Sequence, residues 1–162
     1  MLSATLTEAS PGPPLPGRRT PPEKWHITLR FLGECTEPEA ERVMHSLSQI
    51  SGLDPGRVWC DGLDAFPRMS NANVVYLRVD DPTGLLGYLA AVCDEAAVSA
   101  GFEPEGRPYV PHVTLSRLRP ARDVRSLIGG FNEFRTPVAV QAITFMRSRG
   151  SHYEIIDSIP LC

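Results

Sequence analysis

Alternating apolar and polar residues mark two strands that carry nearly the same tetrapeptide. Residues 25–32 contain His-Ile-Thr-Leu, and residues 109–118 contain His-Val-Thr-Leu 86 positions later in the chain. Because successive side chains of a strand point to opposite faces, the histidine and threonine of each copy share one face. The aliphatic residues share the other face. Each strand is therefore expected to turn its aliphatic face to a core and to present an imidazole beside a hydroxyl.

Helical periodicity predicts three helices between and after these strands. The first spans 37–51, where Thr36 and Glu39 have the spacing of a capping box. The second spans 83–100 and is followed by a glycine placed to end it. A short third helix is expected near 122–128.

Period-2 runs predict two hairpins and a short N-terminal strand. The hairpins pair 57–66 with 73–79 and 138–145 with 153–159, with turn residues between their strands. The first 22 residues hold six of the sixteen prolines, which remove backbone donors. We therefore expect 1–22 to be an irregular lead-in apart from a short strand at 2–6, with 1–19 packing little against the rest, and 23–162 to form one domain.

The order of elements repeats, since each motif strand is followed by a helix and then a hairpin. This repeat predicts an α+β fold with two pseudo-symmetric lobes related by a pseudo-two-fold axis. Each lobe is an antiparallel sheet with helices on the outside, and the two HxTL strands face a central cleft. Two histidines and two threonines in one site suit the chemistry of a phosphate diester.

Composition and net charge argue against several classes of protein. The chain has 162 residues and a net charge of −3, which argues against a protein that coats long nucleic acids. The four scattered cysteines are typical of a reduced, cytoplasmic protein, and no apolar run is long enough for a membrane span. No cluster has metal-ligand spacing, so we expect no metal and no cofactor.

Two extended motifs resemble a known family. They are His26-Ile27-Thr28-Leu29-Arg30-Phe31-Leu32-Gly33-Glu34 and Arg107-Pro108-Tyr109-Val110-Pro111-His112-Val113-Thr114-Leu115-Ser116-Arg117. They are similar to the signatures of the two-histidine phosphoesterase superfamily, and most of all to its RNA 2′,3′-cyclic phosphodiesterases, also called 2′-5′ RNA ligases, of bacteria and archaea. The similarity covers about 24–161. Family members usually begin with a hydrophobic strand and a helix, which 1–19 does not resemble.

The resemblance implies a metal-independent hydrolysis of an RNA or nucleotide 2′,3′-cyclic phosphodiester to a 2′-phosphomonoester, with 2′-5′ ligation as its reverse. It implies that His26 donates a proton to the leaving oxygen and that His112 accepts one from water. Histidine suits either role near neutral pH, and the sequence itself does not decide between them. Thr28 and Thr114 would bind the non-bridging phosphate oxygens. The partner is then an RNA end with a cyclic phosphate, bound by a monomer.

Other side chains have open or structural interpretations. Arg30 shares strand parity with His26 and is either a phosphate contact or a solvated side chain. Arg117 falls on the opposite parity unless its strand bulges, so its role stays open. Tyr109 and Trp25 are more suited to packing than to base stacking, and two further histidines, at 45 and 152, are expected to be solvated. Arginines at 107, 117, 119, 122 and 125 form either a nucleotide-attracting cluster or, more simply, a solvated face.

Two rival functions remain open. One is a related enzyme for a small-molecule cyclic phosphate, such as that of ADP-ribose. The other is a protein that binds RNA ends without turnover, although two proton-transfer groups exceed what binding needs.

Overall fold

The computed structural model describes residues 1–5, 14–50, 52–130, 135–150 and 152–162. Its strands are β1 (Leu2–Thr5), β2 (Arg18–Arg19), β3 (His26–Arg30), β4 (Gly56–Phe66), β5 (Ala72–Asp80), β6 (His112–Arg122), β7 (Thr136–Val140), β8 (Ala142–Arg149) and β9 (His152–Pro160). Its α-helices are α1 (Glu37–Ser48), α2 (Leu85–Ser99) and α3 (Arg125–Ile128), and short 3₁₀ turns span Pro22–Lys24 and Met69–Asn71. The expected α+β class is confirmed.

All these strands join one antiparallel sheet. Its order is β7-β4-β5-β6-β3-β1-β8-β9, and β2 pairs with the far part of β6. The two motif strands, β3 and β6, are therefore neighbours at the centre of the sheet. They are joined at Ile27 and Val113.

Each half of the sheet draws strands from both halves of the chain. The hairpin β4–β5 follows the first motif but lies beside β6, which carries the second motif. The hairpin β8–β9 follows the second motif but reaches β3, which carries the first motif, through β1. The repeated sequence order thus becomes one sheet with two four-stranded halves, β7-β4-β5-β6 and β3-β1-β8-β9, and each half holds one motif strand and the hairpin that follows the other motif.

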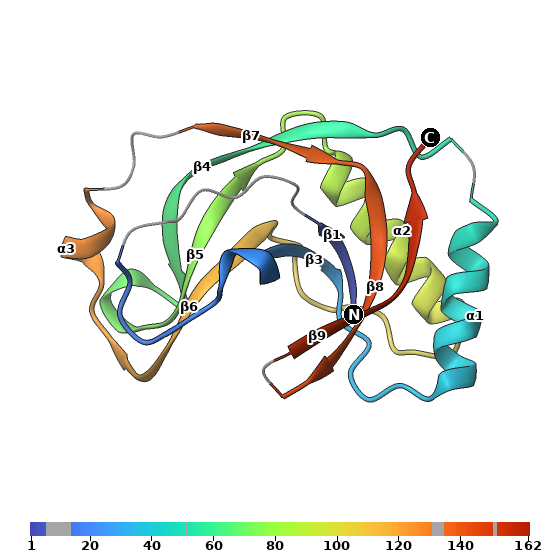
Figure 1. The fold of residues 1–162 in the computed structure, drawn as a ribbon, viewed down its shortest axis with the longest axis horizontal. Coiled ribbons are helices and arrows are strands. Elements are labelled where there is room, and N and C mark those ends of the chain that lie inside the picture. Colours follow the sequence, from blue (N-terminus) through green and yellow to red (C-terminus); the bar gives the residue numbers. More distant parts are fainter. Residues whose placement is uncertain (6–13, 51, 131–134, 151) are drawn as a thin grey trace.

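The closing hairpin differs from the expectation in one respect. We predicted a single strand over 138–145, but the chain breaks at Gln141 into β7, which pairs with β4, and β8, which pairs with β1 and β9. These two strands stand near opposite ends of the sheet order although one residue connects them. The sheet must therefore curl until its ends approach, as Figure 1 shows. The large buried residues change parity at the break, from Val138 and Val140 to Ile143 and Phe145, which is consistent with the change of pairing partner.

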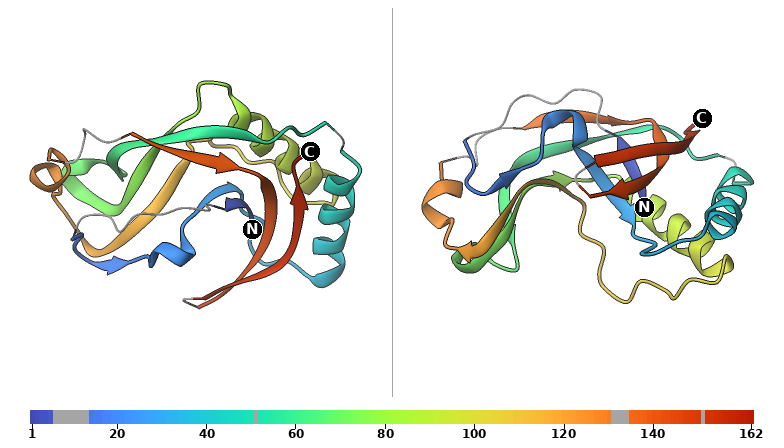
Figure 2. Two further views of the ribbon diagram at one scale, coloured as in Figure 1. Left: turned by 45° about the horizontal axis from the view of Figure 1, so that its top comes forward. Right: turned by 60° about the horizontal axis from the view of Figure 1, so that its bottom comes forward.

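The two long helices lie on the side of the sheet to which β3 turns its aliphatic residues. α1 packs against α2, and α2 packs against β3, as two views in Figure 2 show. α1 begins at the expected capping box, in which the backbone N–H of Thr36 donates to Glu39 Oε2 at 2.8 Å. Leu86 and Leu89 of α2 join one core with Ile27 of β3. None of the helices in the described ranges is long and apolar enough to cross a bilayer.

The N-terminal segment packs more than its prolines suggested. The short strand is confirmed as β1, and Leu2 and Ala4 are fully buried between β3 and β8. Leu15 is also buried, and the Ser116 hydroxyl donates to the carbonyl of Pro16. The prediction that this segment packs little is wrong for 2–4 and for the stretch from Leu15 to Arg19, which is held against β6. The rest of the lead-in, including Leu6, lies outside the described residues.

Gly17 explains how the segment approaches the sheet so closely. Its φ is +83°, and a Cβ at this position would lie 2.5 Å from the carbonyl oxygen of Arg117. Only glycine combines this backbone conformation with such a close contact. The lead-in is therefore fixed against β6 immediately before β2 begins.

Candidate active site

The register of the central strands brings the two motifs together on one face. Because Ile27 pairs with Val113 in antiparallel fashion, His26 lies across from Thr114 and Thr28 lies across from His112. Directly opposed residues of neighbouring strands project to the same side of a sheet. The four expected site residues therefore form a compact square, with the two histidines on one diagonal.

Burial follows the same division. Ile27 and Val113 are fully buried under the helices, whereas the histidines and threonines are half-buried on the other face. The strand alternation that the sequence predicted is therefore present in both motifs. It leaves the polar face free to receive a ligand.

A matching hydrogen bond orients each imidazole. His26 Nδ1 lies 2.8 Å from the carbonyl oxygen of Lys24, and His112 Nδ1 lies 2.8 Å from that of Val110. A carbonyl only accepts, so each Nδ1 carries the proton and each Nε2 is left for chemistry. Both histidines are thus held in the same tautomer by the residue two positions earlier.

Aromatic rings hold the imidazoles from the side. The His26 ring meets Tyr153 of β9 edge-on, with centroids 4.9 Å apart. The His112 ring meets Phe66 at 5.1 Å and Tyr76 at 5.2 Å, and these two aromatic rings stack on each other at 4.3 Å. Such contacts limit rotation of the imidazoles. No local sequence pattern marks these three rings, because contacts between residues far apart in the chain leave no local signal.

Burial and positive charge lower the pKa of both histidines from the ordinary value of 6.5. Removal from water is the largest cause for each, and the Arg117 guanidinium adds to it, while the hydrogen bond to a backbone carbonyl acts in the opposite direction. A charge on His112 also lowers the pKa of His26. Because repulsion between two charged imidazoles is mutual, the pair binds its second proton less readily than its first.

The Thr28 hydroxyl has only a weak acceptor. It donates to the sulfur of Met1 at 3.6 Å. A thioether accepts hydrogen bonds weakly, so a phosphate oxygen would readily replace it. The backbone of Thr28 is held separately, because its carbonyl accepts a hydrogen bond from the Tyr109 hydroxyl at 3.2 Å.

A bulge settles the side on which Arg117 lies. Tyr76 pairs with Thr114 but Val75 pairs with Ser116, so Leu115 is an extra residue in β6. Leu115 and Ser116 are both buried, and Arg117 is exposed on the side that carries Thr114. Its effect on both histidine pKa values agrees with this placement. Strict alternation therefore fails here.

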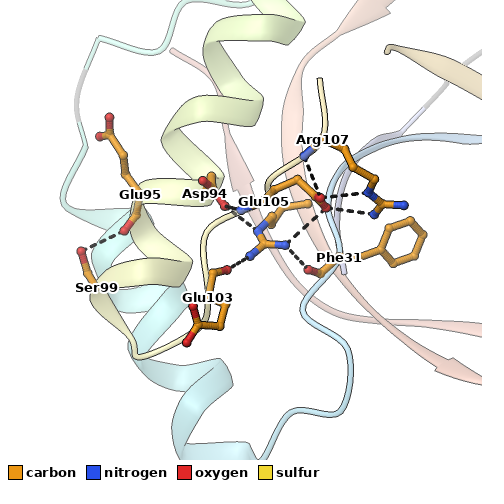
Figure 3. Close-up of polar contacts among 8 residues, drawn as sticks. Phe31, Asp94, Glu95, Ser99, Glu103, Glu105 and Arg107 are labelled. Carbon is orange, nitrogen blue, oxygen red and sulfur yellow. Dashed lines mark hydrogen bonds and ion pairs between the residues drawn. The ribbon is translucent and has the colours of Figure 1, made fainter. Parts of the chain in front are cut away.

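Arg30 is neither a phosphate contact nor a solvated side chain. It is 9% exposed, and its Nε lies 2.7 Å from Asp94 Oδ1 of α2 in an ion pair whose angle is outside the hydrogen-bond range. Its other nitrogens donate to the backbone carbonyls of Phe31 and Glu103. Figure 3 shows these partners converging on one guanidinium. Arg30 thus joins β3 and α2 to the segment that leads into β6.

The same segment carries a further ion pair. Glu105 lies 3.7 Å from Arg30 and accepts two hydrogen bonds from the Arg107 side chain. These bonds from Arg107 lower the pKa of Glu105 to about 2. Arg107 is therefore paired with the carboxylate of Glu105. Arg125 is paired with the carboxylate of Asp123 in the same way. This part of the arginine cluster is a solvated face.

The remaining sequence interpretations are structural. Trp25 is buried and its indole N–H donates to the Thr20 carbonyl at 2.8 Å, so it is a packing residue like Tyr109. His45 and His152 are exposed. The four cysteines are free. Within the described ranges, no three side chains of metal-binding type are gathered at one point.

With this geometry in view, comparison with known proteins identifies the family. Residues 5–152 match the 2′-5′ RNA ligase superfamily. The chain belongs to this superfamily. An RNA 2′,3′-cyclic phosphodiesterase of Aeropyrum pernix is 36% identical over 114 residues, which is 70% of this chain and 64% of that protein. One of Bacillus subtilis is 35% identical over 97 residues, covering 59% and 52% respectively. The matches thus span about half to two thirds of these superfamily members.

Solved structures show the same fold. The crystal structure of Escherichia coli LigT complexed with 3′-AMP superposes with a TM-score of 0.78 at 23% identity. The superposition covers 99% of this chain and 95% of that one. The curled antiparallel sheet with its helices is therefore the LigT-like fold.

Proposed function

We propose that this protein opens 2′,3′-cyclic phosphodiesters at the ends of RNA or nucleotides and leaves a 2′-phosphomonoester. The observation that supports it best is the pair of histidines held by matching Nδ1–H bonds, each across the strand from the other motif's threonine. The superfamily membership and the named relatives point to the same reaction.

The arrangement supplies what the reaction needs. Opening the ring requires one group to take a proton from the attacking water and another to give a proton to the leaving ribose oxygen. Two Nε2 atoms on one diagonal suit groups on opposite sides of phosphorus. The threonine hydroxyls on the other diagonal suit hydrogen bonds to the non-bridging oxygens, which stabilise the transition-state charge.

We assign His26 as the proton donor to the 3′ oxygen and His112 as the acceptor that activates water, as the family resemblance implies. In the free protein the pKa values of both imidazoles are lowered. A bound phosphodiester carries a negative charge and raises the pKa of both imidazoles. Under this assignment, substrate binding brings His26 to its protonated form.

The roles are reversible by nature, so the same groups would serve 2′-5′ ligation in the opposite direction. No step uses a metal ion in this scheme. Arg117, on the face of the histidines, would add positive charge near the phosphate. We expect the enzyme to act as a monomer, since the site is assembled from one chain. We expect it to act in the cytoplasm, where free cysteines such as its four stay reduced.

The test is a direct assay with product analysis. An oligonucleotide ending in a 2′,3′-cyclic phosphate is incubated with the protein in excess EDTA, and the product is identified by ³¹P NMR. A 2′-phosphomonoester is the expected product. No turnover, a 3′-phosphate, or activity that EDTA abolishes and Mg²⁺ restores would each contradict the proposal.

The same assay separates the rival functions. ADP-ribose cyclic phosphate is tested beside the oligonucleotide, and a much higher kcat/KM for it would favour the small-molecule enzyme. Binding of a cyclic-phosphate end without turnover would favour the binding protein.

A further inference from the structure

Both motif strands bulge at the same place in the motif. On β6 the extra residue is Leu115, opposite β5, and on β3 it is Leu29, opposite β1. A one-residue bulge changes the side of the sheet to which the next side chain points. The fifth residue of each motif, Arg30 or Ser116, therefore turns away from the histidines and is buried.

Arg30 holds the segment that leads into the second motif. Its guanidinium donates to the backbone carbonyl of Glu103, which lies nine residues before the histidine of that motif. Its ion-pair partner, Asp94, accepts a hydrogen bond from the backbone N–H of Glu105 at 3.1 Å (Figure 3). The beginning of the segment is therefore attached to β3 and α2.

The other end of this segment is fixed beside the histidine. The Tyr109 hydroxyl donates to the carbonyl of Thr28 at 3.2 Å, so the first motif also holds the neighbour of Val110. The Val110 carbonyl accepts the Nδ1–H of His112. Prolines at 104, 108 and 111 restrict the backbone of the segment. The first motif thus fixes the carbonyl that orients the histidine of the second motif.

The second motif holds the segment before the first motif in the same way. The Ser116 hydroxyl donates to the carbonyl of Pro16, which lies ten residues before His26. The Leu115 carbonyl accepts a hydrogen bond from the N–H of Thr20 at 2.7 Å. A short 3₁₀ turn then leads to the carbonyl that orients His26. In each motif, one carbonyl and the side chain of the fifth residue therefore hold the segment that approaches the other motif.

Resting on the function proposed above, we propose that Arg30 and Ser116 are reciprocal positioning residues, each of which fixes the imidazole of the other motif. Arg30, together with Tyr109, fixes His112, and Ser116 fixes His26. Arg30 and Ser116 are at most 9% exposed and donate to backbone carbonyls, so they act through the imidazoles and not on the substrate. A change in one motif should therefore alter the histidine of the other motif.

Three variants and two matched controls test this proposal. Arg30→Lys keeps the charge but lacks the planar fork that reaches two carbonyls. Tyr109→Phe and Ser116→Ala each remove only a hydroxyl group. Tyr88→Phe and Ser99→Ala remove the same groups from exposed positions on α2 and should match the parent.

The tautomer of each imidazole is measured in the free protein by long-range ¹H–¹⁵N correlation spectra. Arg30→Lys and Tyr109→Phe should move the nitrogen signals of His112 toward a mixture of tautomers and leave those of His26 unchanged. Ser116→Ala should move the signals of His26 and leave those of His112 unchanged. On a cyclic nucleotide, kcat of the two hydroxyl variants should fall about three- to tenfold while KM changes less than about twofold, because one hydrogen bond that aligns an imidazole is lost.

Equal movement of both imidazoles, movement within the altered motif alone, or an unchanged spectrum for the variants of either motif would overturn the reciprocal positioning. The spectra require no turnover, so a parent protein that opens no cyclic phosphate would refute the proposed function separately. Circular dichroism confirms that each variant is folded. If Arg30→Lys does not fold, Asp94→Asn, which removes the charge from the same ion pair, takes its place with the same expected result.

Discussion

The two halves of the candidate site share one motif but differ in their surroundings. His26 and His112 have the same Nδ1–H bond to the residue two positions earlier. His112 is flanked by the stacked pair Phe66 and Tyr76 in the middle of the sheet, whereas His26 meets Tyr153 of the outermost strand, β9. A repeated motif thus fixes tautomer and direction, while the elements packed around it set each pKa.

The largest effect is expected from either histidine alone. A general acid or base typically contributes 10²–10⁴ in rate, so His26→Ala and His112→Ala should each lose about that much kcat/KM on a cyclic phosphate. The double variant should lose less than the product of the two, because the pair acts as a unit. His45→Ala, an exposed residue on α1, serves as the control. Near-parental activity in either folded single variant would show that the two histidines do not both take part in catalysis.

A thio-substituted substrate distinguishes the roles of the two histidines. A thiol has a pKa of about 8.5, so sulfur in place of the 3′ oxygen leaves without protonation. The variant that lacks the proton donor should then recover most of its loss, and the variant that lacks the acceptor should not. We expect recovery in His26→Ala, measured as initial rates on both substrates. Recovery in His112→Ala instead would assign the two roles in the opposite order.

Much of this site follows from the sequence, and its limits have physical causes. The motif strands, both long helices and the capping box depend on local patterns, and they are present as predicted. The position of Arg117 depends on the one-residue bulge at Leu115, which alternation cannot show. The burial of Arg30 depends on Asp94, 64 positions later in the chain. Contacts with residues distant in sequence therefore determine the positions of Arg117 and Arg30, which the local pattern left open.

Substitution of either threonine should lower the activity less than substitution of a histidine, and the two losses should be similar. Thr28→Val and Thr114→Val keep the side-chain shape and remove one hydrogen bond to a charged oxygen each, so kcat should fall about ten- to a hundredfold. Because the register places the two equivalently, the two losses should be similar. Steady-state kinetics on a cyclic nucleotide provides the comparison. A tenfold difference between the variants would show that only one hydroxyl contacts the phosphate.

The smallest expected effect is a shift of the pH profile. Both histidine pKa values lie below 6.5 in the free protein, and the active form has one proton on the pair. The bell-shaped profile of kcat/KM should therefore peak below pH 6.5 and fall as the pH rises further. Arg117→Gln removes a positive charge that lowers both values, so its profile should move to higher pH. An unmoved profile would place that guanidinium too far away to act on the histidines.

The exchange of hairpins between the two halves has a consequence for folding. If the chain were cut between β5 and α2, one fragment would contain β3 without the β8–β9 hairpin, and the other would contain β6 without β4–β5. Each fragment would hold one histidine together with the hairpin that packs beside the other histidine. Assembly of the two proton-transfer groups is therefore cooperative, and a single local opening at the centre of the sheet would disable both.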